Sequence, residues 1–222
     1  ADNRIWFGRE GNNVPRVKRF LSETEGQTVP TYWDFSEVGS NEEATEEVLS
    51  LFDGVKAFDT PKPVRLMRRL LEIGTSKDAG HLVLDFFAGS GSMADAVIRQ
   101  NAEDGGDRRL LLVQINEECN PKSDAARAGY KTIAQVSRER IRRAAGQARS
   151  QAGLMSQIFD SGFRVLRVDS TNMADVERTP DQIDQLTLDH LESSIKPDRS
   201  GEDLLFQVLL DWGLELTMPI EI

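Results

Sequence analysis

Apolar and polar positions follow two kinds of pattern along the chain. Two short apolar runs, over 81–84 and 110–113, are typical of buried strands, and turn-forming residues precede each of them. Apolar residues recur at helical spacing in several longer stretches, over 41–52, 60–71, 93–98, 134–151 and 201–212. Because strands and helices alternate through the middle of the chain, the pattern favours an α/β fold with a parallel sheet.

Both ends of the chain have weaker patterns. Residues 5–8 predict a short strand, and the glycine and asparagines over 11–13 predict a turn after it. Residues 162–169 alternate as a strand does, the polar stretch 171–200 suggests one helix around 183–191, and 214–222 is apolar and extended. The last third therefore predicts a small α/β appendage.

Two glycines, Gly89 and Gly91, lie between the strand over 81–84 and the helix that begins at Met93. A strand-to-helix turn without Cβ atoms lets a ligand approach the backbone closely, and the first N–H groups of the helix suit an anionic or polar group. The alternative is a tight turn that binds nothing.

The residues around these glycines resemble a known cofactor loop. The run D-F-F-A-G-S-G-S over 85–92 is similar to the S-adenosylmethionine loop of amino-methylating DNA methyltransferases. T-P-K-P-V-R-L over 60–66 is similar to the motif that precedes that loop in the β-class order of these enzymes. With 14–21 and 138–143, the resemblance covers nearly the whole chain and indicates the C-terminal part of a type III restriction-modification modification subunit.

The resemblance implies a fold and a division of the chain. The fold is α/β, a partial Rossmann-like S-adenosylmethionine-dependent methyltransferase core with the small α/β C-terminal appendage. Residues 1–58 are expected to end a target-recognition region and linker, 59–151 to form the cofactor-binding part of the core, and 152–222 to form an acidic C-terminal module.

The resemblance also implies cofactor residues. Lys62 stands at a helix entry, where its ammonium can meet the methionine carboxylate of S-adenosylmethionine, and Asp85 is expected near the amino group. The aromatic rings after Asp85 are expected to contact the cofactor, and the glycines to allow close approach. The full expected set is Lys62, Pro63, Asp85, Phe86, Phe87, Ala88, Gly89, Gly91, Gln114 and Glu117.

Two residues are candidates for binding the ribose hydroxyls of the cofactor. Rossmann-like units place an acid at the end of the second strand, where it binds the ribose hydroxyls. Here that position is Gln114, and Glu117 follows three residues later. A carboxylate accepts both hydroxyls in charge-assisted bonds, which slightly favours Glu117; an acid that helps to cap the next segment is the competing interpretation.

Basic residues gather in two stretches. Arg16, Lys18 and Arg19 lie on an extended piece and can contact DNA phosphates or simply solvate an edge strand. The helix over 134–151 has an apolar stripe, and its arginines are expected to point elsewhere, as a solvated face or toward phosphate or an acidic partner: Arg138, Arg140, Arg142, Arg143 and Arg149.

Composition limits the remaining choices. The net charge of −10 argues against nucleic-acid binding over the whole surface, and residues 160–222 hold fourteen acids against five basic residues. The one cysteine, Cys119, cannot form an internal disulfide, which favours a reducing cytoplasm, and two distant histidines make no metal spacing. No apolar run is long enough to span a membrane.

One motif of the resembling family is missing. Amino-methylating enzymes use Asp or Asn, two prolines and an aromatic residue at the target base, and no two prolines are adjacent in this sequence. We therefore expect a fragment without catalytic residues, which supplies about half of the S-adenosylmethionine pocket of a full-length enzyme that binds this cofactor. The full enzyme would methylate an exocyclic amine of double-stranded DNA, adenine N6 in preference to cytosine N4.

Partners and rival functions follow from the same observations. A restriction (helicase-nuclease) subunit and a second copy are the expected protein partners. A non-catalytic assembly module that docks a restriction subunit and a Rossmann-type nicotinamide oxidoreductase are the alternatives. An oxidoreductase would account for the glycines, but not for the T-P-K-P motif over 60–63 or the D-F-F run over 85–87.

Overall fold

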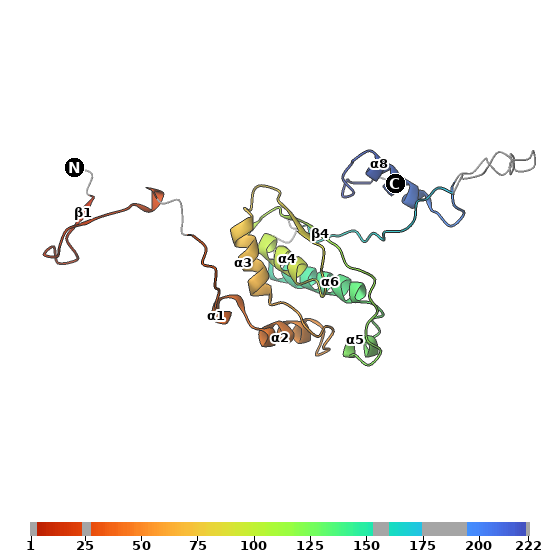
Figure 1. The fold of residues 1–222 in the computed structure, drawn as a ribbon, viewed down its shortest axis with the longest axis horizontal. Helices are drawn as coiled ribbons and strands as arrows, with labels where there is room; N and C mark the ends of the chain where they lie inside the picture. The colour runs from red at the N-terminus through yellow and green to blue at the C-terminus, as the bar shows by residue number, and fades with distance from the viewer. Residues whose placement is uncertain (1–3, 24–27, 153–159, 175–194, 221–222) are drawn as a thin grey trace, which may run out of the picture. The chain divides into compact units, whose positions relative to one another are not determined.

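The computed structural model describes residues 4–23, 28–152, 160–174 and 195–220 (Figure 1). The chain divides into two compact units, Ala1–Ser161 and Gly162–Ile222. The roles predicted for the three segments stay predictions.

A two-stranded parallel sheet forms the centre of the first unit. Strand β3 (Leu82–Asp85) pairs with β4 (Arg109–Leu112), with Leu82 opposite Arg109 and Asp85 opposite Leu112. Helix α4 (Ser92–Asp104) connects the two strands. Parallel strands need such a crossover, so the strand, glycine turn, helix and strand predicted from the sequence are confirmed, as is the mixed α/β class.

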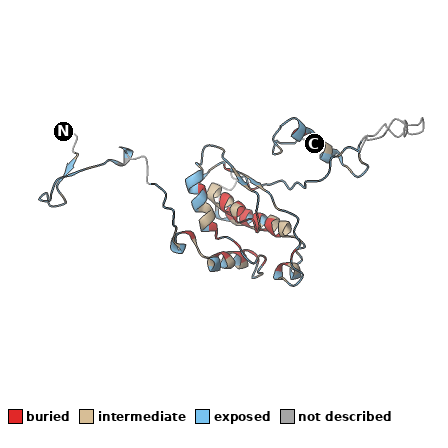
Figure 2. Ribbon diagram, viewed as in Figure 1, coloured by how far each residue is buried: buried red, intermediate tan, exposed pale blue. Residues whose placement is uncertain are grey.

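Helix α4 lies between two other helices. It packs against α3 (Val64–Gly74) on one side and α6 (Ile133–Ala152) on the other (Figure 1). Buried residues concentrate on α4 and α6 (Figure 2). One apolar cluster joins α3, α4 and the inner face of the sheet, with these members: Val64, Met67, Leu71, Val83, Met93, Ala96, Val97 and Leu110.

A second apolar cluster joins α6 to α2 (Asn41–Leu51) and to the one-turn helix α5 (Asp124–Arg127). The buried members are Val48, Leu51, Phe52, Ala57, Cys119, Ala125 and Val136. Burial, and secondarily the charge of Glu117, raises the pKa of the Cys119 thiol.

The outer face of the sheet is open in the described structure, which corrects one prediction. The apolar runs of β3 and β4 were expected to form buried strands. Instead, Leu82, Leu84 and Leu111 are 58%, 54% and 48% exposed, while Val83 and Leu110 pack against the helices. Side chains alternate between the faces of a strand, and all the packed helices lie on one face, so every second residue stays exposed.

The N-terminal part of the first unit is a small hairpin followed by short helices. Strands β1 (Ile5–Trp6) and β2 (Arg16–Val17) pair antiparallel, as the sequence predicts for 5–8 and the extended piece after it. A 3₁₀ turn, η1 (Leu21–Glu23), follows, and α1 (Phe35–Val38) precedes α2.

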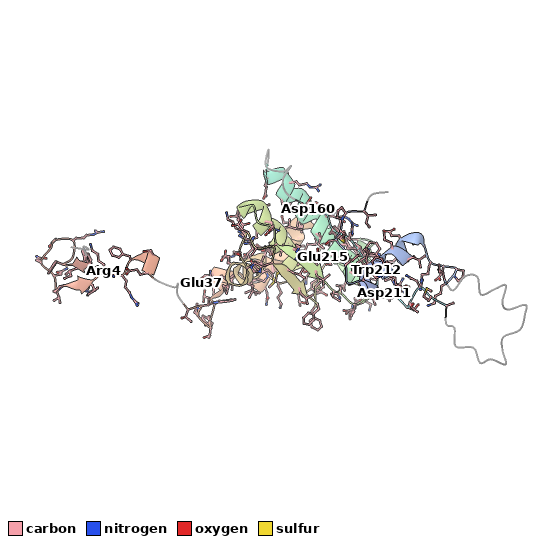
Figure 3. The ribbon with its side chains drawn as sticks, turned by 90° about the horizontal axis from the view of Figure 1, so that it is seen from above. Arg4, Glu37, Asp160, Asp211, Trp212 and Glu215 are labelled. Atoms are coloured by element: carbon pink, nitrogen blue, oxygen red, sulfur yellow. The ribbon has the colours of Figure 1, made fainter. Side chains whose placement is uncertain are left out.

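The second unit differs from its predicted α/β form. Helix α8 (Gly201–Asp211) is confirmed, with Trp212 at its C-terminal end (Figure 3). Residues 162–169 form no strand, and 214–220 contains a turn closed by the Met218 N–H to the Glu215 carbonyl. An isolated bridge joins Met173 to Ile195, and the helix predicted around 183–191 lies outside the described residues.

Candidate functional site

The turn between β3 and α4 is closed by its own hydrogen bonds. The Gly91 N–H donates to the Ala88 carbonyl at 2.8 Å, and the Ala88 N–H donates to the Val113 carbonyl beyond β4 at 3.2 Å. The Gly89 N–H donates to Oε1 of Gln114 at 2.7 Å. The N–H groups of Ala88, Gly89 and Gly91 are therefore used in hydrogen bonds within the protein. A ligand at this turn would contact the α-carbons of the loop and the first N–H groups of α4.

The two glycines meet different neighbours. Both have positive φ, 53° at Gly89 and 80° at Gly91, where side chains are strained. A Cβ at Gly89 would lie 3.4 Å from Cζ of Phe58, an ordinary van der Waals contact, so the backbone conformation is what favours glycine at this position. A Cβ at Gly91 would lie 2.9 Å from Oγ of Ser137, so Gly91 is required by the packing of α6 whether or not a ligand binds.

The residues before the glycines are partly open. Asp85 is half-buried at the end of β3, and its Oδ1 accepts the Phe87 N–H at 3.1 Å. Among the residues that the structure describes, no donor bonds its Oδ2. Phe86 and Phe87 are 60% and 84% exposed, with ring centroids 5.2 Å apart, so they present an apolar surface beside the turn.

The Lys62–Pro63 segment enters α3. Lys62 is exposed between buried Pro61 and Pro63, and Pro63 is the N-cap of the helix but offers no side-chain cap. The cap comes from another helix, because the Val64 N–H donates to both carboxylate oxygens of Glu47, at 3.0 and 3.2 Å. Glu47 thus holds the backbone directly after the predicted lysine and proline.

Gln114 and Glu117 are placed differently. The side-chain carbonyl of Gln114 accepts the Gly89 N–H at 2.7 Å, and its Nε2 donates to the Ile115 carbonyl at 3.3 Å, so part of the side chain's capacity for hydrogen bonds is already used within the protein. Glu117 is exposed, and its backbone carbonyl accepts the Ile133 N–H at the start of α6. The structure thus assigns Gln114 a contact that sequence reasoning did not find, a brace for the glycine turn.

Arg140 corrects the prediction for the basic helix. It was expected to point away from the apolar stripe, but its side chain is fully buried. Its Nε donates to Oδ2 of Asp95 at 3.1 Å, and its Nη1 donates to Oγ of Ser90 at 3.2 Å and of Ser92 at 3.0 Å. Its Nη2 lies 3.7 Å from Oε2 of Glu47. Arg140 therefore joins α6 to the glycine turn, to α4 and to α2.

Sequence reasoning missed Arg140, Asp95 and Glu47, although a signal existed. Val136, Arg140, Ala144 and Ala148 recur every four residues, and all four are buried. This spacing places Arg140 within the apolar stripe of its helix. An arginine on a buried face requires an acid opposite, and Asp95 stands among the small residues of α4.

Glu47 faces several charges. Burial raises the pKa of its carboxyl, and the charges of Asp95 and Glu43 add to this, whereas the Val64 N–H and Arg140 oppose the shift. A polar cleft between α2, α3 and α4 opens beside it, with Glu46, Arg68 and Arg99 among the lining residues. Glu47 therefore keeps its proton to higher pH in the folded chain than in the unfolded chain.

This shift predicts a pH-dependent difference between the wild type and Glu47→Gln. Because the folded state binds the Glu47 proton more tightly, this carboxyl favours folding when it is protonated. The wild-type free energy of unfolding, relative to the variant, should fall as pH rises from the ordinary value of 4.5 through the raised pKa. Urea denaturation between about pH 4 and 8 measures it, and a constant difference would contradict it.

The basic residues of the hairpin lie on β2 and directly after it. Arg16 and Arg19 are exposed, and Lys18 is partly covered, its backbone N–H donating to the Arg4 carbonyl at 2.6 Å. The hairpin also exposes Trp6 and Val17. This arrangement is compatible with either interpretation made from the sequence.

Among the described residues, no group of three or more His, Cys, Asp and Glu side chains could hold a metal ion. In the same residues, none of the helices combines the length and apolar character needed to cross a membrane.

Comparison with known proteins decides the family. Residues 5–121, more than half of the chain, match the N6/N4 family of DNA methylases. The chain belongs to this DNA methylase family. The matched stretch contains the hairpin, the Lys62–Pro63 segment, the glycine turn and Gln114, whereas Arg140 and helix α6 lie beyond it.

Individual relatives agree with this assignment. The chain is 40% identical over 167 residues to the type III restriction-modification enzyme StyLTI Mod subunit of Salmonella typhimurium (strain LT2), covering 75% of the chain and 24% of that protein. It is 32% identical over 214 residues to the EcoPI Mod subunit of Escherichia phage P1, covering 96% and 32%. The type II methyltransferase M.KpnI of Klebsiella pneumoniae is 35% identical over 142 residues, covering 64% and 33%.

These matches confirm the resemblance to type III modification subunits that the sequence motifs predict. The chain spans about a quarter to a third of the length of these curated relatives.

Proposed function

We propose that this methylase chain supplies the S-adenosylmethionine-binding part of a DNA methyltransferase, built as part of a Rossmann-like core. The reaction would methylate an exocyclic base amine, adenine N6 in preference to cytosine N4. The observation that carries the proposal is the glycine turn at the carboxyl end of β3, with its open aromatic surface and half-buried Asp85, in a chain of this family. Ligands of α/β sheets bind at this end of the strands.

The side chains at the turn and at the entry to α3 fit S-adenosylmethionine in their chemistry. Lys62 offers a cation for its carboxylate, Oδ2 of Asp85 an acceptor for its ammonium, and Phe86 and Phe87 apolar rings for its adenine. When bound, the cofactor supplies a methyl group activated by its attachment to a sulfonium.

For the ribose hydroxyls we propose Glu117. Its exposed carboxylate can accept from both hydroxyls, whereas the carbonyl of Gln114 is already engaged by Gly89. Gln114 would then act on the cofactor indirectly, by bracing the turn. No residue of this chain is proposed as catalytic, because the Asp/Asn-Pro-Pro-aromatic motif is not in its sequence.

The test is a matched pair of glycine substitutions in the intact protein that carries this chain. Gly89→Ala and Gly105→Ala both place a methyl group at positive φ, but nothing lies within 4 Å of the added group at Gly105. Calorimetric titration with S-adenosylmethionine should show an affinity loss of about tenfold or more for Gly89→Ala, equivalent to about 1.4 kcal/mol, and little change for Gly105→Ala. Equal affinities in the wild type and Gly89→Ala would refute the proposal.

Double-stranded DNA is the proposed substrate, with phosphate contacts from Arg16, Lys18 and Arg19. If these residues neutralise phosphates, replacing all three should reduce the salt dependence of DNA binding, because each phosphate contact releases counterions. An unchanged salt slope would favour the solvated-strand interpretation.

A second, compatible role is assembly. Helix α8 and the turn after it expose Val208, Leu210 and Trp212, at 44%, 61% and 75%. We propose this surface for a restriction subunit or a second copy, in a cytoplasmic complex, since apolar patches of this kind mark protein contacts. Co-purification with residues 162–222 deleted tests this role, and undiminished partner retention would remove it.

A further inference from the structure

Arg140 bonds to one side of the proposed cofactor site. Its guanidinium donates to the hydroxyls of Ser90 and Ser92, which flank Gly91, and to the carboxylate of Asp95 in the first turn of α4. Asp95 is also held by Arg99, whose Nε donates to Oδ1 at 2.5 Å. The glycine turn is therefore fixed to α6 through one buried cation.

The same guanidinium faces the other side of the site. Nη2 of Arg140 is buried, has no hydrogen-bond partner among the described residues, and lies 3.7 Å from Oε2 of Glu47. Glu47 in turn accepts the Val64 N–H, the first amide of α3, directly after Pro63. The chain of contacts thus runs from the glycine turn, through Arg140 and Glu47, to the backbone beside Lys62.

We infer that Arg140 is a positioning residue that sets, through Glu47, where the Lys62–Pro63 segment stands relative to the glycine turn. The inference rests on the proposed function, because these two segments are the sides of the proposed S-adenosylmethionine site. Their sequence positions are 62–64 and 89–92, and Arg140 reaches both from a third element, α6.

The geometry of arginine explains why this residue type stands here. A planar guanidinium carries donors on three nitrogens, so Arg140 can meet Asp95, two hydroxyls and Glu47 at once. A lysine would keep the charge but has a single donor nitrogen, which cannot reach Glu47 while it also bonds to Asp95 and the two hydroxyls. The Glu47 contact is the longest in the network and is held by charge, so it is the contact that a lysine should release first.

The first arm of the test measures the unliganded intact protein by hydrogen exchange resolved at single amides. Arg140→Lys should speed exchange of the Val64 amide by about tenfold or more, relative to amides in the middle of α3, because Glu47 is no longer anchored. Arg143→Lys is the control, since Arg143 lies one turn away on α6 and pairs with Glu139 and Asp53 instead. Glu47→Gln is a second variant that should repeat the effect if Arg140→Lys folds poorly.

The second arm asks whether Arg140 acts through Lys62. S-adenosylmethionine affinity is measured for Lys62→Met, Arg140→Lys and the double variant. If Arg140 positions Lys62, each single change should weaken binding by about tenfold, and the double variant should be no more than about twofold weaker than Lys62→Met. If Arg140 had only a general structural role, the affinity loss of the double variant would be the product of the two single losses, and this result would overturn the inference. Unchanged exchange of the Val64 amide in Arg140→Lys would also overturn it.

The two arms separate this inference from the proposed function. A wild-type protein that does not bind S-adenosylmethionine would defeat the proposed function, while accelerated Val64 exchange in Arg140→Lys would still support the positional link. Binding by the wild type with equal affinity in Arg140→Lys would leave the proposed function standing and remove the inference.

Discussion

Asp95→Ala should destabilise the chain by about 3–5 kcal/mol, because it leaves the Arg140 charge buried without its main partner. Asp95 is 1% exposed and Arg140 is fully buried, so water cannot replace the lost carboxylate. Arg99, which also donates to Asp95, loses this carboxylate in the same change and, among the described residues, keeps only its bond to Oε1 of Gln147. Guanidinium denaturation monitored by circular dichroism measures the loss.

A control variant at an exposed ion pair and a double variant at the buried pair test whether the loss comes from the uncompensated Arg140 charge. Asp124→Ala removes a carboxylate from an exposed pair with Arg127 and should lose about 1 kcal/mol or less. The double variant Asp95→Ala with Arg140→Met removes both buried charges and should recover part of the stability, since the uncompensated cation is gone. A loss for Asp95→Ala no larger than that for Asp124→Ala would contradict the buried-pair interpretation.

Gly91→Ala should be the second large effect. A left-handed backbone with a side chain costs about 1–2 kcal/mol, and Gly91 has φ of 80°. The added methyl group would also stand 2.9 Å from Oγ and 3.4 Å from the carbonyl oxygen of Ser137, and such overpacking costs about 1–3 kcal/mol more. Thermal and chemical denaturation measure the total loss in the free energy of unfolding.

Gly105→Ala is the matched control at the other end of α4. Its φ is 68° and nothing lies near the added methyl, so only the backbone strain applies, about 1–2 kcal/mol. Adding Ser137→Ala to Gly91→Ala should recover part of the difference, because it removes the closest atom. Equal losses at Gly91 and Gly105 would show that α6 does not press on the turn.

Local patterns were sufficient to predict most of the first unit. The strand, glycine turn, helix and strand from Leu82 to Leu112 follow from short apolar runs, turn residues and helical spacing, which act over a few neighbouring residues. The same is true of α2, α6 and α8. The glycine turn was found in this way, whereas the role expected for Asp85 came from the resemblance of residues 85–92 to a methyltransferase loop.

The rest depended on contacts between distant segments. The bond from Gly89 to Gln114 joins residues 25 apart, and that from Arg140 to Asp95 joins residues 45 apart. No local pattern contains such a pair, although the four-residue spacing of Val136, Arg140 and Ala144 shows which face carries the arginine. The strand predicted over 162–169 failed for the same reason, because alternation supplies no partner strand.

The leucine face of the sheet has a practical consequence for work with these 222 residues. Leu82, Leu84 and Leu111 form an apolar surface that faces water. Unpaired N–H and C=O groups at the edges of a sheet beside such a surface can pair with strands of other molecules. Produced as a separate polypeptide, the chain should bind dyes that fluoresce on apolar surfaces and should associate with itself at high concentration.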